Sequence, residues 1–228
     1  MAEDLKKDEV HVWHSPLTVS AAELTYAETF LSGGERRYAH RFTNEHAKIE
    51  FVIGRARLRE LLGRYVKRDG RELEFGITRE GKPFLVTAPE YEFNLTHSGD
   101  VVLYGIARGR PVGVDIERLK PIPRALELSK RYMLPEEHAL VTAASSETRD
   151  RAFLSLWVKR EGSGKAYGVG IWKVLESHRR ESPNPLFDQI MRDYSYQVID
   201  YPPGYVACVA ALGADWRLVR RGNCTSDC

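Results

Sequence analysis

Apolar and polar residues alternate along several short stretches of this chain, and elsewhere the apolar residues recur at helical spacing. Alternation is typical of strands with one buried face, and a period near 3.6 is typical of amphipathic helices. A long helix is predicted from Asn44, which offers an N-terminal cap, to about Lys67, and a second helix covers the stretch around Phe153 to Glu161. Strands are predicted at 9–15, 72–77, 91–96, 101–107, 112–119, 195–201 and 205–212.

The order of these elements is similar in the two halves of the chain. A long helix followed by a strand and a hairpin occurs at 44–107 and again at 147–212, without a repeat of the sequence itself. This order predicts an α+β fold of two pseudo-symmetric lobes, each a long helix packed on a small, mainly antiparallel sheet. We assign 1–108 to the N-terminal lobe, 109–213 to the C-terminal lobe and 214–228 to a polar tail, and expect the active site in the cleft between the lobes.

The composition, with 43% hydrophobic and 29% charged residues, is that of an ordinary soluble globular protein. A net charge of +2 gives no reason to expect nucleic-acid binding, and no apolar run approaches the roughly 20 residues that span a bilayer. The start of the chain is too polar for a signal peptide, and Cys208, Cys224 and Cys228 form no disulfide framework. We expect a cytoplasmic monomer that contacts neither membrane nor nucleic acid, because two lobes of one chain can form the cleft alone.

The predicted strand at 112–119 carries two carboxylates on one face. Asp115 and Glu117 are two residues apart, so their side chains point the same way, while Ile116 between them points the other way. Adjacent like charges repel unless a cation lies between them. Mg²⁺ is the plainest candidate because it prefers oxygen ligands and keeps substrate phosphates in its shell. The alternative is an exposed edge strand with two solvated acids.

A second group of charged residues lies further along the chain. Trp157, Glu161 and Lys165 are four residues apart and share one face of the predicted helix, where Trp157 belongs to the apolar stripe. Charges that continue a buried stripe need partners. Asp115, Glu117 and Glu161 would together supply three carboxylate ligands for magnesium, and Lys165, one turn further, would bind a phosphate oxygen. The alternative is a surface pair of Glu161 and Lys165 that contributes about a few tenths of a kcal/mol.

The sequence GSGK that ends at Lys165 resembles the end of a phosphate-binding P-loop. That motif needs a glycine five residues before its Gly-Lys pair and a Ser or Thr after it. Lys159 and Ala166 occupy these positions, so the motif does not indicate an NTPase.

Other basic residues are candidates for binding an anion. The polar face of the first long helix is rich in arginine, Arg55 among them, although a solvated face often has this composition. Gly81 and Pro83 mark a turn that presents Lys82. His97 stands at the mouth of a predicted hairpin, where a histidine is more often a structural hydrogen-bond partner than a ligand.

A series of motifs, between about residue 35 and residue 212, resembles those of 4'-phosphopantetheinyl transferases of the surfactin-synthetase-activating type. In chain order the motifs are GKPF, FNLTHSG, VGVDIERL, WVKREGSGK and PGYVACVAAL. The resemblance implies transfer of the phosphopantetheine arm of coenzyme A to a serine of an apo acyl or peptidyl carrier protein, with release of adenosine 3',5'-bisphosphate. Coenzyme A is then the co-substrate, the carrier protein is the partner, and Mg²⁺ is the cofactor.

The resemblance also implies roles for the residues of these motifs. Asp115, Glu117 and Glu161 would bind magnesium, and Glu161 would deprotonate the serine, either directly or through a metal-bound water. Lys165 would stabilise the leaving phosphate. The residues expected to bind coenzyme A are Lys82, His97, Arg160, Lys165 and, at the nucleotide end, Arg55.

The chain departs from the family pattern next to Glu161. Arg160 stands where the family usually has lysine, and Gly162, Ser163 and Gly164 stand where it usually has bulkier helix formers. A glycine inside a helix lowers helix stability by about 1 kcal/mol relative to alanine. We therefore expect the helix to fray beyond Glu161 and to hold Lys165 loosely. Two other hypotheses stay open: a module that binds coenzyme A or a carrier without transfer, and a magnesium-dependent phosphotransferase that uses a nucleoside triphosphate.

Overall fold

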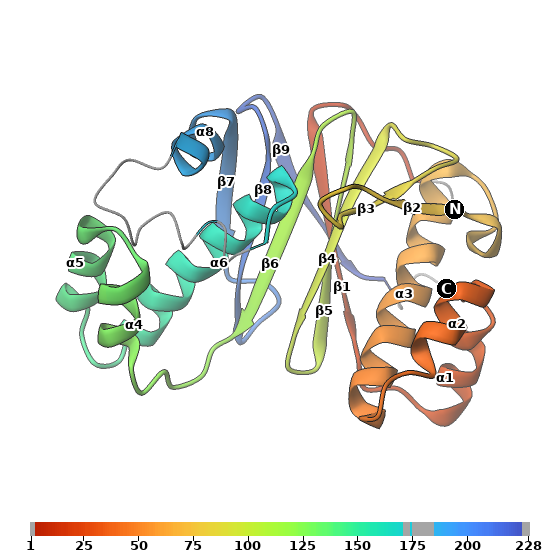
Figure 1. Cartoon of the computed structure of the whole chain (residues 1–228), viewed down its shortest axis with the longest axis horizontal. Helices are drawn as coiled ribbons and strands as arrows, with labels where there is room; N and C mark the ends of the chain where they lie inside the picture. Colours follow the sequence, from red (N-terminus) through yellow and green to blue (C-terminus); the bar gives the residue numbers. More distant parts are fainter. Residues whose placement is uncertain (1–2, 171–173, 175–184, 225–228) are drawn as a thin grey trace.

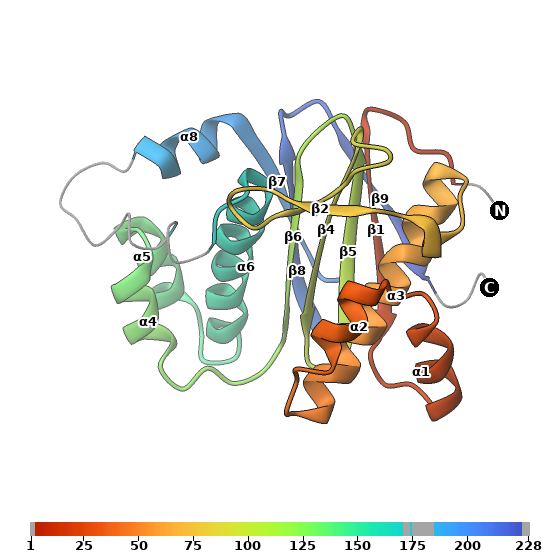
Figure 2. The same ribbon diagram turned by 45° about the vertical axis from the view of Figure 1, so that its right-hand side comes forward.

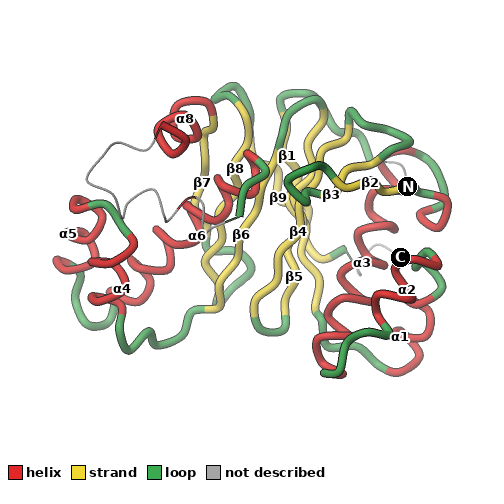
Figure 3. Tube along the Cα trace, viewed as in Figure 1, coloured by secondary structure: helices red, strands yellow, loops and turns green. Residues whose placement is uncertain are grey.

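The computed structural model of the chain describes residues 3–170, 174 and 185–224. Four layers follow one another across the molecule: helix α3 (Glu45–Val66), a four-stranded sheet, a three-stranded sheet and helix α6 (Arg149–Tyr167) (Figure 1). The two sheets face each other in the middle, and helices cover their outer faces in the turned view as well (Figure 2). The tube view shows the same separation, with strands in the centre and helices on both flanks (Figure 3). The predicted α+β class with two lobes is confirmed.

The first lobe is built around α3. Its elements are β1 (Glu9–Pro16), α1 (Ala21–Glu28), α2 (Gly33–Ala39), α3 (Glu45–Val66), a 3-10 turn (Gly70–Glu72), β2 (Phe75–Ile77), β3 (Pro83–Leu85), β4 (Tyr91–Ser98) and β5 (Val101–Arg108). The side chain of Asn44 accepts a hydrogen bond from the backbone N–H of Ala47 at 3.1 Å, so α3 begins at the predicted cap. The main sheet has the order β4-β5-β1-β9, in which β9 (Arg217–Asn223) comes from near the end of the chain, while β2 and β3 form a separate hairpin.

The second lobe is built around α6. Its elements are β6 (Val112–Arg118), α4 (Ala125–Tyr132), α5 (Pro135–Ala143), α6 (Arg149–Tyr167), α8 (Pro185–Asp193), β7 (Tyr194–Ile199) and β8 (Tyr205–Leu212). The strands form an antiparallel sheet in the order β6-β8-β7. No helix in the described part of the chain combines the length and the apolar character needed to cross a membrane.

The two sheets meet along a core of aliphatic side chains. Val12 and Leu103 of the first sheet belong to the same fully buried cluster as Val114 and Val209 of the second. Gly105 on β5 faces Val114 so closely that a Cβ atom there would lie 2.5 Å from the valine Cγ1 atom. This close contact fixes the spacing of the sheets and leaves β4 beside β6.

Helix α6 runs without a break to its left-handed cap at Gly168, so the predicted fraying beyond Glu161 is wrong. The glycines let the helix lie close to the strands beneath it. A Cβ atom on Gly162 would lie 3.2 Å from the Sγ atom of Cys208, and one on Gly113 of β6 would lie 2.3 Å from the carbonyl oxygen of Gly162. Close packing against the sheet therefore outweighs the low helix propensity of glycine.

The segment predicted as a polar tail contains a strand of the first sheet. Strand β9 (Arg217–Asn223) pairs in parallel with β1, and Cys224 directly after it is buried. Arg217 forms an ion pair with Glu9 on β1. Charged side chains are common on edge strands, where they remain in contact with solvent. The prediction of a tail is therefore wrong for 217–224, while Cys228 lies outside the described residues.

Candidate active site

Strand β6 carries the two carboxylates that the alternating pattern predicts. Val114 and Ile116 point into the core between the sheets, so Asp115 and Glu117 occupy the opposite face of the strand. Asp115 is only 3% exposed, and Glu117 is half-buried. The strand is not an exposed edge with solvated acids, because Asp115 lies beneath α6 and beside β4.

Helix α6 brings two more charged groups to Asp115. The Nζ atom of Lys165 lies 2.7 Å from Oδ1 of Asp115 and 3.4 Å from Oε1 of Glu161. The side chains of Glu161 and Lys165 are 24% and 25% exposed, so this point can be reached from solvent. Three residues from two separate motifs thus meet at one place, and Glu161 and Lys165 are more than a pair on the helix surface.

Strand β4 contributes a hydroxyl group to the same place. Thr96 Oγ1 donates a hydrogen bond to Asp115 Oδ1 at 3.1 Å and accepts one from Lys165 Nζ, also at 3.1 Å. One threonine therefore contacts both members of the ion pair and holds them next to each other.

Two further side chains of β4 also reach β6. Ser98 Oγ donates to Glu117 Oε2 at 2.9 Å and accepts a hydrogen bond from the backbone N–H of Arg118 at 3.1 Å. Asn94 Oδ1 accepts a hydrogen bond from the backbone N–H of Val114 at 3.0 Å. Alternate residues of β4 from Asn94 to Ser98 therefore each fix a part of the strand that carries the carboxylates.

The environment of Asp115 disfavours its charged form. Burial raises the pKa of its carboxyl group to about 7; Glu161 and Glu117 add to this effect, while the ammonium group of Lys165 opposes it. The second carboxylate oxygen, Oδ2, is buried and has no hydrogen-bond partner among the residues that the structure describes. A buried, unpaired carboxylate oxygen is unfavourable, and a cation would satisfy it.

Within 3–170, 174 and 185–224, no three His, Cys, Asp or Glu side chains are grouped closely enough to hold a metal ion in this conformation. Asp115 and Glu161 both face the ammonium group of Lys165, and Glu117 accepts a hydrogen bond from Ser98. The donor chemistry nevertheless suits a hard divalent cation, because all three groups are carboxylates and one oxygen of Asp115 is unpaired.

Comparison with known proteins assigns a family to this arrangement. A family model described as the 4'-phosphopantetheinyl transferase superfamily matches 111–210, and one described as the 4'-phosphopantetheinyl transferase N-terminal region matches 15–107. The 4'-phosphopantetheinyl transferase HetI of Nostoc sp. (strain PCC 7120) is 31% identical over 217 residues, which cover 93% of this chain and 92% of that protein. The chain belongs to the 4'-phosphopantetheinyl transferase family.

Other relatives of this transferase extend the same match. The 4'-phosphopantetheinyl transferase Sfp of Bacillus subtilis (strain 168) is 26% identical over 193 residues, covering 82% of this chain and 85% of that protein. A putative 4'-phosphopantetheinyl transferase of Synechocystis sp. (strain PCC 6803) is 33% identical over 146 residues, covering 63% of this chain and 59% of that protein. The family predicted from the motifs is confirmed.

Lys82 lies close to the C-terminal end of α6. Its Nζ atom donates to the carbonyl oxygens of Val112 at 3.2 Å and Ala166 at 3.4 Å, and it lies 3.5 Å from Glu92. Burial lowers the pKa of Lys82, and Glu92 opposes that shift. Lys82 and Lys165 line the same cavity of about 200 Å³, so the transferase brings these two predicted phosphate ligands together.

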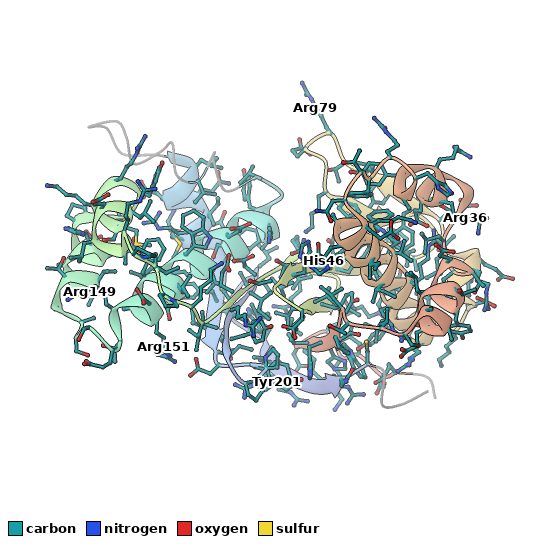
Figure 4. The ribbon with its side chains drawn as sticks, turned by 90° about the horizontal axis from the view of Figure 1, so that it is seen from below. Arg36, His46, Arg79, Arg149, Arg151 and Tyr201 are labelled. Atoms are coloured by element: carbon teal, nitrogen blue, oxygen red, sulfur yellow. The ribbon has the colours of Figure 1, made fainter. Side chains whose placement is uncertain are left out.

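His97 lies on the opposite face of β4 from Thr96. Its side chain is 51% exposed, with Nδ1 3.8 Å from Oε1 of Glu50, an oxygen that also lies 3.3 Å from Nε2 of His46. Figure 4 shows His46 near the boundary between the two lobes, whereas Arg36 lies on the outer flank of the first. The predicted ligand His97 is thus accessible, beside a histidine and a glutamate that the sequence analysis did not select.

Arg55 lines a different cavity from Lys82 and Lys165. Its Nε atom lies 3.4 Å from Oε1 of Glu35, and its guanidinium group lies 5.5 Å from the centre of the Phe75 ring. Burial lowers the pKa of Arg55, and Glu35 opposes this shift. The cavity, of about 540 Å³, lies between α2, α3 and the β2–β3 hairpin.

Arg160 is fully buried and forms an ion pair with Glu137 of α5, so the structure does not bring this predicted coenzyme A ligand to the cavity that Lys82 and Lys165 line. Glu137 also lies 3.3 Å from Nζ of Lys159. Arg160 lies between Lys159 and Glu161 in the sequence. Because successive side chains of a helix point in different directions, Arg160 does not share the side of α6 that carries Glu161. Its charge therefore stabilises the contact between α5 and α6.

The side chains of β4 that contact β6 are the main site residues that sequence reasoning missed. Asn94, Thr96 and Ser98 alternate with apolar or exposed residues, which is also the pattern of a solvent-facing strand. Their position in the motif FNLTHSG is the one sequence signal that points to them, and His97 is the only predicted site residue in that motif.

Proposed function

We propose that this chain transfers the 4'-phosphopantetheine arm of coenzyme A to a serine of an apo acyl or peptidyl carrier protein. The observation that carries the proposal is the meeting of Asp115, Glu161 and Lys165 at one accessible point, in a member of this family. Phosphoryl transfer depends on positioning and on stabilising negative charge, which cation ligands, a base and an ammonium group can supply.

We further propose that the reaction uses Mg²⁺ held by Asp115, Glu117 and Glu161. The unpaired Oδ2 atom of buried Asp115 supports this assignment, as does the purely carboxylate donor set. When bound, the ion would neutralise negative charge on the pyrophosphate of coenzyme A.

Glu161 is the proposed base because its carboxylate is partly exposed beside Lys165. As the proton of the serine hydroxyl passes to Glu161, the serine oxygen forms a bond to the phosphorus atom that carries the pantetheine arm. The bond from that phosphorus to the bridging oxygen breaks, and its electron pair stays with adenosine 3',5'-bisphosphate. Lys165 stabilises the charge that develops on this leaving group.

Lys82 and His97 are proposed to bind further phosphate oxygens of coenzyme A. Lys82 lines the cavity next to Lys165, and the ring of His97 is exposed at the end of β4. Arg55 is the weaker candidate for the nucleotide end, because its guanidinium group is already paired with Glu35.

The direct test is incubation of the protein with coenzyme A, MgCl₂ and an apo carrier protein, followed by mass spectrometry of the carrier. The carrier should gain one phosphopantetheine arm, and chelation of magnesium should stop the gain. No mass change across acyl and peptidyl carriers would contradict the proposed transfer. Continued transfer in chelator would contradict only the proposed metal.

The Glu161→Ala variant tests the proposed base and ligand. Turnover should fall by about 10²- to 10⁴-fold, because general base catalysis and a metal ligand are lost together, while the far-UV circular dichroism stays unchanged. Glu28→Ala, at an exposed position of α1, is the matched control and should keep the wild-type rate. Wild-type turnover in Glu161→Ala would remove the residue from the mechanism.

A module that binds coenzyme A without transferring its arm is not favoured. Its main support was the expected fraying of the helix beyond Glu161, and α6 is continuous through Lys165. Calorimetric binding of coenzyme A without any modification of a carrier would be the result that restores it.

A further inference from the structure

Strands β4 and β6 are edges of two different sheets, and they are joined by side chains of β4 rather than by hydrogen bonds between their backbones. The backbone of β4 pairs with β5, and the backbone of β6 pairs with β8. The contacts between β4 and β6 come from Asn94, Thr96 and Ser98, which occupy alternate positions on one face of β4. This row of polar side chains therefore links the first lobe to the strand that carries the carboxylates.

Ser98 makes the most specific of these contacts. Its hydroxyl proton is donated to Oε2 of Glu117, and its oxygen accepts the backbone N–H of the next residue, Arg118. One hydroxyl group thus fixes both the backbone on one side of Glu117 and the carboxylate itself. Among the described residues, Ser98 makes the only hydrogen bond to the Glu117 carboxylate. The carboxylate of Asp115, by contrast, has two partners, Thr96 and Lys165.

We propose that Ser98 is a positioning residue for Glu117, which it holds in one orientation on the face of β6 that also carries Asp115. The inference rests on the proposed function, in which Glu117 is a magnesium ligand. Groups that hydrogen-bond to a metal ligand orient it, and their removal typically weakens metal affinity by about 10- to 100-fold. Ser98 belongs to the first lobe, so the second lobe's metal ligands depend on the first lobe for their geometry.

The test measures metal binding directly. Magnesium is titrated calorimetrically into the full-length protein in the presence of coenzyme A and without carrier, so that no turnover occurs. Ser98→Ala should bind magnesium about tenfold more weakly than wild type. In the transfer assay its half-activating magnesium concentration should rise by a similar factor, while kcat at saturating magnesium returns to within about threefold of wild type. Ser98→Thr keeps the hydroxyl group and should restore the affinity.

Ser195 offers a matched control in the second lobe. Its hydroxyl group donates to the carbonyl oxygen of Gly213 at 2.6 Å and accepts the indole N–H of Trp216 at 2.7 Å, so it has the same two-bond pattern without a carboxylate. Ser195→Ala should lower the melting temperature about as much as Ser98→Ala but leave magnesium affinity unchanged. A merely structural role for Ser98 predicts the same result for both variants and would overturn the inference.

A double-mutant cycle identifies the group through which Ser98 acts. In a Glu117→Gln background, Ser98→Ala should have little further effect on magnesium affinity, because the group that it orients is already changed. A full additional tenfold loss would overturn the inference. If Ser98→Ala does not fold, Ser98→Cys, which keeps the size and weakens the donor, replaces it in the cycle.

These outcomes separate the inference from the proposed function. If the wild type transfers the arm and binds magnesium but Ser98→Ala binds it equally well, only the positioning role is overturned. If the wild type transfers the arm without binding magnesium, the metal assignment fails and the role of Ser98 fails with it. If the wild type does not transfer the arm at all, the proposed function itself is overturned.

Discussion

Helices α3 and α6 occupy equivalent places on the outer faces of the two sheets, but of the two only α6 places charged side chains beside a buried carboxylate of its sheet. Along α3 most of the residues facing the sheet are apolar, as Val52, Ile53 and Leu58 illustrate, and Glu50 lies beside the exposed His97 near the end of β4. Along α6 the corresponding stripe changes to Glu161 and Lys165 at its C-terminal end. The comparison teaches that helix α3 acts mainly as a scaffold, while α6 places the proposed chemistry on the same architecture.

The two helices also approach their sheets differently. A Cβ atom on Gly54 of α3 would meet Leu95 Cδ1 at 3.6 Å, which is an ordinary contact, whereas on Gly162 of α6 it would meet Cys208 at 3.2 Å. On Gly113, beneath α6, it would overlap the backbone of the helix. The glycines of α6 therefore bring charged side chains within reach of a buried carboxylate, which larger residues would prevent.

The largest expected effect comes from removing a positive charge from α6 and, for comparison, one from α3. Lys165→Met should lower kcat for transfer by about 10²- to 10³-fold, because a group that stabilises developing charge on the leaving phosphate is removed. The matched change on α3, Arg57→Met, removes a cation paired with Glu60 and should leave kcat within about threefold. Rates are measured with saturating coenzyme A, per mole of folded protein. Equal losses in the two variants would show that the helices are not specialised in this way.

A smaller effect tests the closeness of packing. Gly113→Ala should lower the free energy of unfolding by at least about 1 kcal/mol, because the new methyl group would overlap backbone atoms of α6 that cannot rotate away. Gly54→Ala should raise it by up to about 1 kcal/mol, because alanine favours the helix and has room. Urea unfolding measures both. A Gly113→Ala protein as stable as Gly54→Ala would disprove the contact between β6 and α6.

The smallest expected effect concerns a histidine in the first lobe. His11 Nε2 lies 2.9 Å from Oε2 of Glu9, its Nδ1 lies 2.8 Å from the hydroxyl of Tyr65, and Trp13 also donates to that hydroxyl. Burial lowers the pKa of His11, against the opposing hydrogen bond with Glu9. The unfolded chain therefore binds a proton near pH 6.5 that the folded chain does not, and stability should fall as pH decreases through that value, by at most about 1.4 kcal/mol per pH unit.

Urea unfolding between pH 5 and 8 measures this dependence. His11→Gln should flatten it, because the buried imidazole is removed. An unchanged slope in His11→Gln would show that another group, such as His14, whose pKa burial also lowers, causes the dependence. The second lobe buries Asp115 instead, whose pKa is raised to about 7, so its contribution to stability falls as pH rises through that value and has the opposite sign to that of His11.

Most of the fold could be predicted because its strongest signals are local. The cap at Asn44 and the apolar period after it set the bounds of α3, and alternation located most strands. Strand β3, at Pro83–Leu85, is too short to show a period, and β9 is too polar to resemble a strand. The continuity of α6 depends on contacts with β6 and β8 that lie far away in the sequence, so propensity alone gave the wrong result for its glycines.

The candidate site could be predicted only as far as spacing reports a shared face. Spacing of two residues joined Asp115 to Glu117, and spacing of four joined Glu161 to Lys165, but neither reveals that the strand and the helix meet. It also could not distinguish Arg160, which is buried against Glu137, from its neighbour Glu161. The hydroxyl groups of β4 were missed because their partners lie across a boundary between two sheets.

The parallel pairing of β9 with β1 joins the end of the described chain to its beginning. The chain leaves the first sheet after β5, forms the second lobe, and returns to complete the first sheet with its last strand. The lobes are therefore interlocked in sequence, and a cut between β5 and β6 does not yield two independent folding units. A fragment that ends before β9 would leave β1 as an unpaired edge, open to pairing with another copy of itself.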